Sequence, residues 1–431
     1  MTTANPLAVP VPTQRTNTTA IFIIGFLYFI LGFITWLNGS LIQFLTLVCQ
    51  LKSSQAFLVT TAFYMAYFFL ALPSSFIIKR TGFKNGMVLS LLVMAVGSVI
   101  FIPAAKERSF GLFLTGLFVQ GMGLALLQTA VNPFISILGP IESAAKRISI
   151  MGICNKIAGI ISPLILSAIL LSNATVLEKR IDATTNIAEK EQLLNELSGK
   201  VIMPYVVLAV SLTLLAFALL KSPLPEPQIE EDKTAAEPNV AGNKTSIWQF
   251  PHLLLGALCI FVYVGVEVMA GDAIGVYGKS MGMPLDKTKY FTTFTLISML
   301  AGYVTGIFTI PKYISQQVAL KASASLGILF SFAAFFTSGY TAITFIALLG
   351  LANALMWPAI FPLAIDKLGK FTKTGSALLI MGIAGGAIIP LIYGNLKDRI
   401  PNHQAFFICM LPCYLYILYY SMKGYKAGRK M

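Results

Sequence analysis

Long apolar segments, separated by shorter polar stretches, run through most of the sequence. A helix needs about 20 predominantly apolar residues to cross a bilayer. Twelve segments reach that length: residues 20–43, 56–78, 86–104, 110–137, 148–171, 201–220, 252–278, 289–310, 314–336, 339–364, 374–394 and 404–422. Backbone polar groups in lipid have to be paired within their own segment, and the short alternating runs of a β-barrel do not occur in this sequence. The pattern therefore predicts an all-α membrane protein with twelve transmembrane helices.

Two polar stretches interrupt the regular spacing. Residues 172–200 have mixed charge and a short helical pattern, whereas residues 221–248 contain several prolines and acidic residues. The second stretch separates six segments from six. We therefore expect an N-terminal tail over 1–19, a six-helix bundle over 20–220, a linker over 221–248, a second six-helix bundle over 249–424 and a C-terminal tail over 425–431.

The composition agrees with this division and excludes several classes of protein. Of all residues, 56% are hydrophobic and 11% are charged, against about 25% charged in soluble proteins, so a soluble enzyme is excluded. The basic residues behind the net charge of +14 lie in short clusters between apolar segments, which is unlike a nucleic-acid-binding surface. The five cysteines form no Cys-x-x-Cys pair and there are two histidines, so no metal site, disulfide framework or other cofactor is expected.

The distribution of Lys and Arg predicts the orientation. Cytoplasmic loops of membrane proteins carry an excess of these residues, and here the excess lies on the side of the N-terminus; Lys289 is among the residues assigned to the opposite side. Both termini and the linker are therefore expected in the cytoplasm. The first apolar run is too long for a signal-peptide core, so we expect it to remain as the first membrane helix.

Short sequence matches recur at a nearly constant distance between the two sets of six segments. They pair Gly123-Leu-Ala with Gly350-Leu-Ala, Ile150-Met-Gly-Ile with Ile380-Met-Gly-Ile, and Pro163-Leu-Ile with Pro390-Leu-Ile. Parallel duplicated halves predict a binding site near the middle of the membrane, between the two bundles.

Three charged residues lie deep within apolar segments: Lys156, Glu267 and Asp272. Charges in such positions are functional candidates, and a carboxylate removed from water takes up a proton more readily, as a proton-coupled carrier requires. The alternative is a structural ion pair with Lys156, which would leave one carboxylate without a partner. Glu267 and Asp272 are five residues apart, so they share a face only if the helix breaks near Gly271. These three residues are the candidates for ion coupling.

Amides and indoles in the apolar segments are candidate ligands for a solute. Gln128 and Asn132 are four residues apart and therefore share a helical face. Amides offer donors and acceptors, which suits a neutral polyhydroxylated solute, although each could instead join two helices. Asn155 is open to the same two interpretations. Two pairs of an indole and a nearby amide are further candidates: Trp36 with Asn38, and Trp357 with Asn353. In such a pair the indole can stack on a sugar ring while the amide hydrogen-bonds to it.

Three stretches resemble the sugar-transporter branch of the major facilitator superfamily that includes fucose–proton symporters and bacterial glucose/galactose transporters. They are GFITWLNGS at 32–40, LLQTAVNPFISILGP at 126–140 and RISIMGICNK at 147–156. The second is most similar to the glucose/galactose group. The resemblance implies two pseudo-symmetric six-helix bundles and a monomeric carrier in the bacterial cytoplasmic (inner) membrane. It implies uptake of a monosaccharide, a hexose of the glucose/galactose type, with a proton or sodium as coupling ion.

The sequence departs from the fucose symporters at two positions. Those proteins carry an acidic residue directly after the asparagine of the first segment and another within the motif of the fourth, where this chain has Gly39 and Gln128. Neither can titrate, so Glu267 and Asp272 are the expected substitutes. A membrane enzyme or a sensor is disfavoured, because two scattered histidines and a short linker supply neither a catalytic cluster nor a receptor domain. A carrier or exporter of another small polar metabolite or drug stays open.

Overall fold

The structure is a computed structural model that describes residues 18–137, 144–172, 174–224, 245–310, 312–368 and 371–428. Within these ranges the regular elements are helices, and the fold contains no strand there. Twelve spans in the described part are long and apolar enough to cross a membrane: Thr19–Val48, Ser54–Thr81, Phe83–Lys106, Phe110–Asn132, Ile150–Leu170, Ile187–Lys221, Pro251–Gly271, Leu285–Thr309, Gln316–Phe336, Gly339–Ile365, Thr374–Lys397 and Asn402–Met422. Each overlaps one predicted segment, so the predicted fold class is confirmed.

The helices of the first half run from the N-terminus to the linker. They are α1 (Thr18–Thr35), α2 (Asn38–Val48), α3 (Ser53–Ala56), α4 (Leu58–Thr81), α5 (Phe83–Lys106), α6 (Phe110–Ile137), α7 (Ala144–Leu170), α8 (Ala174–Ala183), α9 (Ile187–Gly199) and α10 (Ile202–Lys221). The predicted polar stretch 172–200 thus forms two helices, α8 and α9, and the Asn186 side chain caps the second by accepting from the Ala188 N–H at 3.0 Å.

The second half begins after a short 3₁₀ turn, η3 (Ile247–Gln249). It contains α11 (Pro251–Gly271), α12 (Ile274–Ser280), α13 (Leu285–Thr288), α14 (Phe291–Thr309), α15 (Gln316–Phe336), α16 (Gly339–Asn353), α17 (Met356–Ile365), α18 (Thr372–Met381), η5 (Gly382–Ala384), α19 (Gly385–Lys397), α20 (Asn402–Met422) and η6 (Gly424–Lys426). Most of the predicted linker and parts of both predicted tails lie outside the described residues, and the predicted domain limits stay a prediction.

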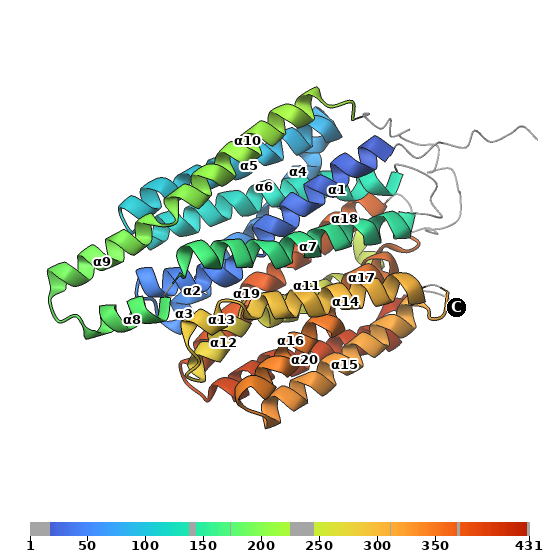
Figure 1. The fold of residues 1–431 in the computed structure, drawn as a ribbon. Coiled ribbons are helices and arrows are strands. Elements are labelled where there is room, and N and C mark those ends of the chain that lie inside the picture. The colour runs from blue at the N-terminus through green and yellow to red at the C-terminus, as the bar shows by residue number, and fades with distance from the viewer. Residues whose placement is uncertain are drawn as a thin grey trace, which may run out of the picture.

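The two halves lie side by side with their long helices running in the same general direction (Figure 1). The halves meet where α7 packs against α14 and where α4 packs against α18 and α19. Helices α2, α8, α9, α12 and α13 gather at one end of the bundle (Figure 1), which we call the α8 end. Any site between the halves is therefore built from helices far apart in the sequence.

Several predicted segments are broken rather than continuous. The first helix of each half breaks: α1 ends at Thr35 and α2 begins at Asn38, while α11 ends at Gly271 and α12 begins at Ile274. A break inside a membrane needs its freed backbone groups satisfied. Threonines of α14 meet that need, because Thr292 donates to the Gly271 carbonyl and Thr295 to the Ala270 carbonyl, each at 2.8 Å. The predicted segment over 252–278 is therefore two helices, and the break, which the sequence permits at Gly271, falls beside that residue.

Candidate functional site

A cavity of about 160 Å³ lies between the two halves. The first half contributes side chains from α1, α4, α6 and α7, and the second half contributes them from α11, α14, α17 and η5. Its lining consists of Tyr28, Leu31, Thr35, Trp36, Tyr64, Tyr67, Gln128, Asn132, Gly152, Asn155, Lys156, Tyr263, Val264, Glu267, Tyr303, Trp357, Pro358 and Ile383. A cavity thus lies at the contact between the halves, the place where the sequence predicts a binding site.

The two amides of α6 both face this cavity and both contact tyrosines. The Gln128 side-chain N–H donates to the Tyr67 hydroxyl at 3.2 Å, and the Tyr28 hydroxyl donates to Oδ1 of Asn132. Their spacing of four residues therefore does place them on one face, toward α4 and α1. Amide and hydroxyl groups each act as donor and acceptor, so this wall can exchange hydrogen bonds with a hydroxylated solute.

A buried ion pair crosses the cavity from one half to the other. Lys156 Nζ on α7 lies 3.0 Å from Glu267 Oε1 on α11, and the two side chains are 7% and 13% exposed. The ammonium also lies 4.4 Å from the centre of the Trp36 ring, in a cation–π arrangement. Because each charge compensates the other, the cavity presents polar groups without net charge.

Trp36 is held where α1 and α2 meet. Its side chain is 2% exposed. A Cβ at Gly159 would lie 2.4 Å from one atom of the ring, and a Cβ at Gly271 would lie 2.5 Å from another. Any side chain at either position would collide with the indole, so these glycines allow the ring to lie between α7 and α11.

Asn155 and Trp357 complete the predicted residues that line the cavity. Asn155 is on α7, one residue before Lys156. Trp357 is at the start of α17, where its ring stacks on Phe361 with centroids 5.7 Å apart and lies 6.4 Å from the Tyr263 ring. Aromatic faces of this kind pack against the apolar face of a sugar ring.

Three predicted site residues do not line the cavity in this conformation. Asn353 is fully buried, accepts from the Tyr414 hydroxyl at 2.9 Å and donates to the Val266 carbonyl at 3.5 Å. It therefore joins α16 to α20 and α11. Asn38 and Asp272 are also buried, at 1% and 0% exposure. Their roles as solute or ion ligands stay predictions.

Comparisons with known proteins show which family this chain belongs to. A family model described as "Major Facilitator Superfamily" matches residues 24–391. This chain belongs to the major facilitator superfamily. It is a multi-pass membrane transporter and not an enzyme, and the family resemblance expected from its motifs is confirmed.

Two relatives and one solved structure are similar to this chain over nearly its whole length. A glucose/galactose transporter of Brucella abortus is 37% identical, over 99% of this chain and 98% of the other. A putative glucose/galactose transporter of Helicobacter pylori is 30% identical, over 96% and 98%. The crystal structure of the Escherichia coli fucose:proton symporter aligns with a TM-score of 0.72 at 24% identity, covering 94% of this chain and 98% of that one. The last comparison shows the shared fold.

The sequence did not single out the tyrosines of the transporter's cavity. Tyr28, Tyr64, Tyr67, Tyr263 and Tyr303 all belong to its lining. In the sequence they lie in apolar segments, where a tyrosine is also compatible with plain core packing. The available signal was their depth, because tyrosines of membrane helices are enriched at the two interfaces rather than in the middle.

Proposed function

We propose that this transporter takes up a neutral monosaccharide, a hexose of the glucose/galactose type, by cation symport with alternating access. The observation that carries the proposal is the cavity between the halves, lined by amides, tyrosine hydroxyls and two indoles, with an internally compensated ion pair. Such a lining offers many hydrogen bonds and aromatic faces but no net charge, which suits an uncharged polyhydroxylated ring.

The relatives support the same solute class. Two relatives that align over nearly their full length are named glucose/galactose transporters. A cavity of about 160 Å³ also suits a small solute better than a drug-sized one, whose pockets usually span about 300–1,000 Å³. We assign Gln128, Asn132, Asn155, Trp36 and Trp357 to solute binding.

The coupling cation is a proton or sodium, and its site lies at the acidic residues of α11 and its end. A symporter has to link the binding of cation and solute. Glu267 and Asp272 are the acidic candidates, with Lys156 as the partner of the first. A relative from Escherichia coli is named an L-fucose-proton symporter, which favours the proton.

We further propose that the protein is a monomer in the bacterial cytoplasmic membrane with both termini inside. The excess of Lys and Arg on the side of the N-terminus and the even number of spans in the described part support this orientation. The α8 end then faces the outside. The partners are the sugar, the cation and the surrounding lipid, and no nucleic acid.

A carrier or exporter of another small polar metabolite or drug is the second candidate. An exporter of amphipathic cations would need an acidic cavity, whereas the one carboxylate lining this cavity is paired with Lys156. The ion pair therefore favours a neutral solute.

Counterflow in proteoliposomes tests the proposal. Purified protein is reconstituted with unlabelled glucose, galactose, fucose or an amino sugar inside, and uptake of the labelled sugar is followed with and without proton or sodium gradients. We expect counterflow of at least one hexose and its stimulation by one gradient. Folded protein that exchanges none of these sugars would contradict the proposal and favour the second candidate.

A further inference from the structure

Asp272 lies at the break between α11 and α12, pressed against the other half of the protein. It is fully buried. Its Oδ1 lies 3.3 Å from the position that a Cβ of Gly39 would occupy, so the carboxyl group faces the backbone of α2. Within the described residues no side chain hydrogen-bonds to either of its oxygens, and the Gly39 backbone N–H is the donor that acts on the carboxyl group. Asp272 is therefore an acid without an ion-pair partner of its own at the contact between the halves.

Lys156 on α7 is the cation that acts on Asp272. The other titratable groups that act on it are Glu267 on α11 and Tyr64 on α4. The ammonium of Lys156 is already paired with Glu267 at 3.0 Å. Helix α2 presents the uncharged Asn38, Gly39 and Gln43, and the Thr292 hydroxyl on α14 donates to a backbone carbonyl. An ionised carboxylate here would be buried and unpaired, whereas the neutral acid is tolerated.

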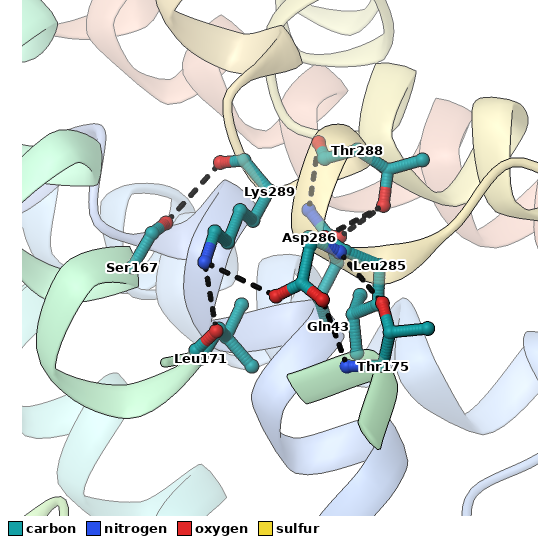
Figure 2. A network of polar contacts seen from close by, with 8 residues as sticks. All are labelled: Gln43, Ser167, Leu171, Thr175, Leu285, Asp286, Thr288 and Lys289. Atoms are coloured by element: carbon teal, nitrogen blue, oxygen red, sulfur yellow. Dashed lines mark hydrogen bonds and ion pairs between the residues drawn. The ribbon is translucent and has the colours of Figure 1, made fainter. Parts of the chain in front are cut away.

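A polar network joins the two halves at the α8 end (Figure 2). We call it the seam; it consists of Gln43, Ser167, Leu171, Thr175, Leu285, Asp286, Thr288 and Lys289. In the first half, these residues belong to α2, α7, α8 and the turn between α7 and α8. In the second half, they belong to α13 and to Lys289, the residue that follows it. Lys289, which the charge pattern assigned to an outer loop, is 6% exposed and donates to the Leu171 carbonyl at 2.8 Å.

Reciprocal hydrogen bonds across the seam hold the two halves in one defined register. The Thr288 hydroxyl donates to Gln43 Oε1 at 2.9 Å, and Gln43 Nε2 donates back to the Thr288 carbonyl at 3.4 Å. In the same way, the Asp286 N–H donates to Thr175 Oγ1 at 3.1 Å, and the Thr175 N–H donates to Asp286 Oδ2 at 3.3 Å. The Ser167 hydroxyl donates to the Lys289 carbonyl at 3.2 Å. Each of these contacts joins the two halves.

Asp272 and the seam occupy one continuous contact. Gly39 and Gln43 are one turn apart on α2, and Gly39 faces Asp272 while Gln43 faces Gly275, where a Cβ would lie 2.2 Å from Gln43 Nε2. With the seam formed, α2 lies against the start of α12 and the Asp272 carboxyl is buried. Separating the halves at this end would expose the carboxyl to water.

We propose that protonation of Asp272 is the condition for closing the seam, so that this residue couples proton binding to alternating access. This inference rests on the proposed function and its orientation. With the seam open, the carboxylate binds a proton from outside water and becomes the neutral acid, and the seam then closes over it. Loss of that proton on the inner side leaves a buried unpaired charge, which reopens the seam and resets the carrier.

The test measures the distance across the α8 end as a function of pH. Spin labels are placed at Ile187 on α9 and Tyr340 on α16, which are 79% and 54% exposed, in full-length protein whose five native cysteines are replaced by serine. The protein is reconstituted without sugar. Because one proton is bound on closing, the closed-to-open ratio should fall by up to about tenfold per pH unit as pH rises.

Neutral substitutions show whether Asp272, and not another titratable group, causes the pH response. In Asp272→Asn, and in Asp272→Ala as a second variant, the closed-to-open ratio should no longer change with pH. Both variants should still open at both ends and therefore retain sugar counterflow, while losing accumulation. Asp398→Asn is the matched control, because this exposed acid also joins the halves at the α8 end, accepting from the Ser54 N–H at 3.3 Å. It should keep the wild-type pH response.

Two results would overturn the inference. One is an unchanged pH response in both Asp272 variants; the other is closure driven by sodium and not by pH. Failure of the proposed function is a separate outcome: wild-type protein would then show no sugar counterflow, whereas the distance measurement needs no sugar and would still report on Asp272.

Discussion

Lys156 on α7 and Glu267 on α11 form an ion pair that spans the two halves, with Nζ 3.0 Å from Oε1. Both side chains are largely buried and both line the cavity. The pair therefore ties the cavity to the contact between the halves, while Asp272, five residues after Glu267, lies at the helix break without an ion-pair partner of its own.

Neutralising one member of this pair should destabilise the protein more than neutralising both. Glu267→Gln or Lys156→Gln leaves the other charge buried and unpaired, which costs about 3–5 kcal/mol. We expect each single variant to lower the thermal midpoint in detergent, and the double variant to recover much of the loss. Additive losses in the double variant would show that the two charges do not stabilise each other.

Removing the amides of α6 should weaken sugar binding. Gln128→Ala and Asn132→Ala each remove hydrogen bonds that contribute about 0.5–1.5 kcal/mol, so the dissociation constant should rise about 2- to 12-fold. Gln120→Ala is the matched control, because Gln120 is on the same helix but donates to Ser98 at 2.8 Å, away from the cavity. Titration of binding in detergent measures the effect. Equal affinities for the wild type and the three variants would show that Gln128 and Asn132 serve helix packing and not sugar binding.

Weakening the seam should shift the transporter toward a state open at the α8 end. Thr288→Val keeps the side-chain shape but leaves Gln43 Oε1 buried without its 2.9 Å donor, at a cost of about 1–3 kcal/mol. The spin-label distance should lengthen at all pH values. Thr305→Val is the control, since this exposed α14 hydroxyl donates within its own helix, to the Ala301 carbonyl. No difference between the two variants would show that the seam contributes nothing to closure.

The orientation can be checked by cysteine labelling in intact cells. In a cysteine-free background, Ile187→Cys on α9 should react with a membrane-impermeant maleimide from outside. Trp248→Cys, at the last residue of the predicted linker and 70% exposed, should react only after permeabilisation. The reverse pattern would invert the proposed topology.

The twelve spans could be predicted from the sequence because span length and hydrophobicity depend on local composition. The helix breaks could not, because they depend on partners from other helices. The break after Gly271 is stabilised by Thr292 and Thr295 of α14. The sequence around Gly271 contains no pattern that predicts those contacts. Only the glycine itself hinted that a break was possible.

The site was predicted in part for the same reason. Gln128 and Asn132 face the cavity because their spacing lies within one unbroken helix, α6. Asn38 and Asn353 lie next to helix breaks, Asn38 at the start of α2 and Asn353 at the end of α16, so the face that each presents depends on tertiary packing. Lys289 looked like a loop residue, and its contacts with the Leu171 carbonyl of the other half and with Asp286 Oδ1 show how its charge is compensated where it is buried.

The most direct test of the whole account is accumulation of labelled hexose in proteoliposomes under an imposed inward proton gradient and a membrane potential of 100 mV. One charge moving through that potential supplies about 2.3 kcal/mol, enough for roughly fifty-fold accumulation. The account predicts that wild-type protein concentrates a hexose, and that Asp272→Asn exchanges it without concentrating it. Normal accumulation by Asp272→Asn, or no hexose transport by the wild type, would contradict it.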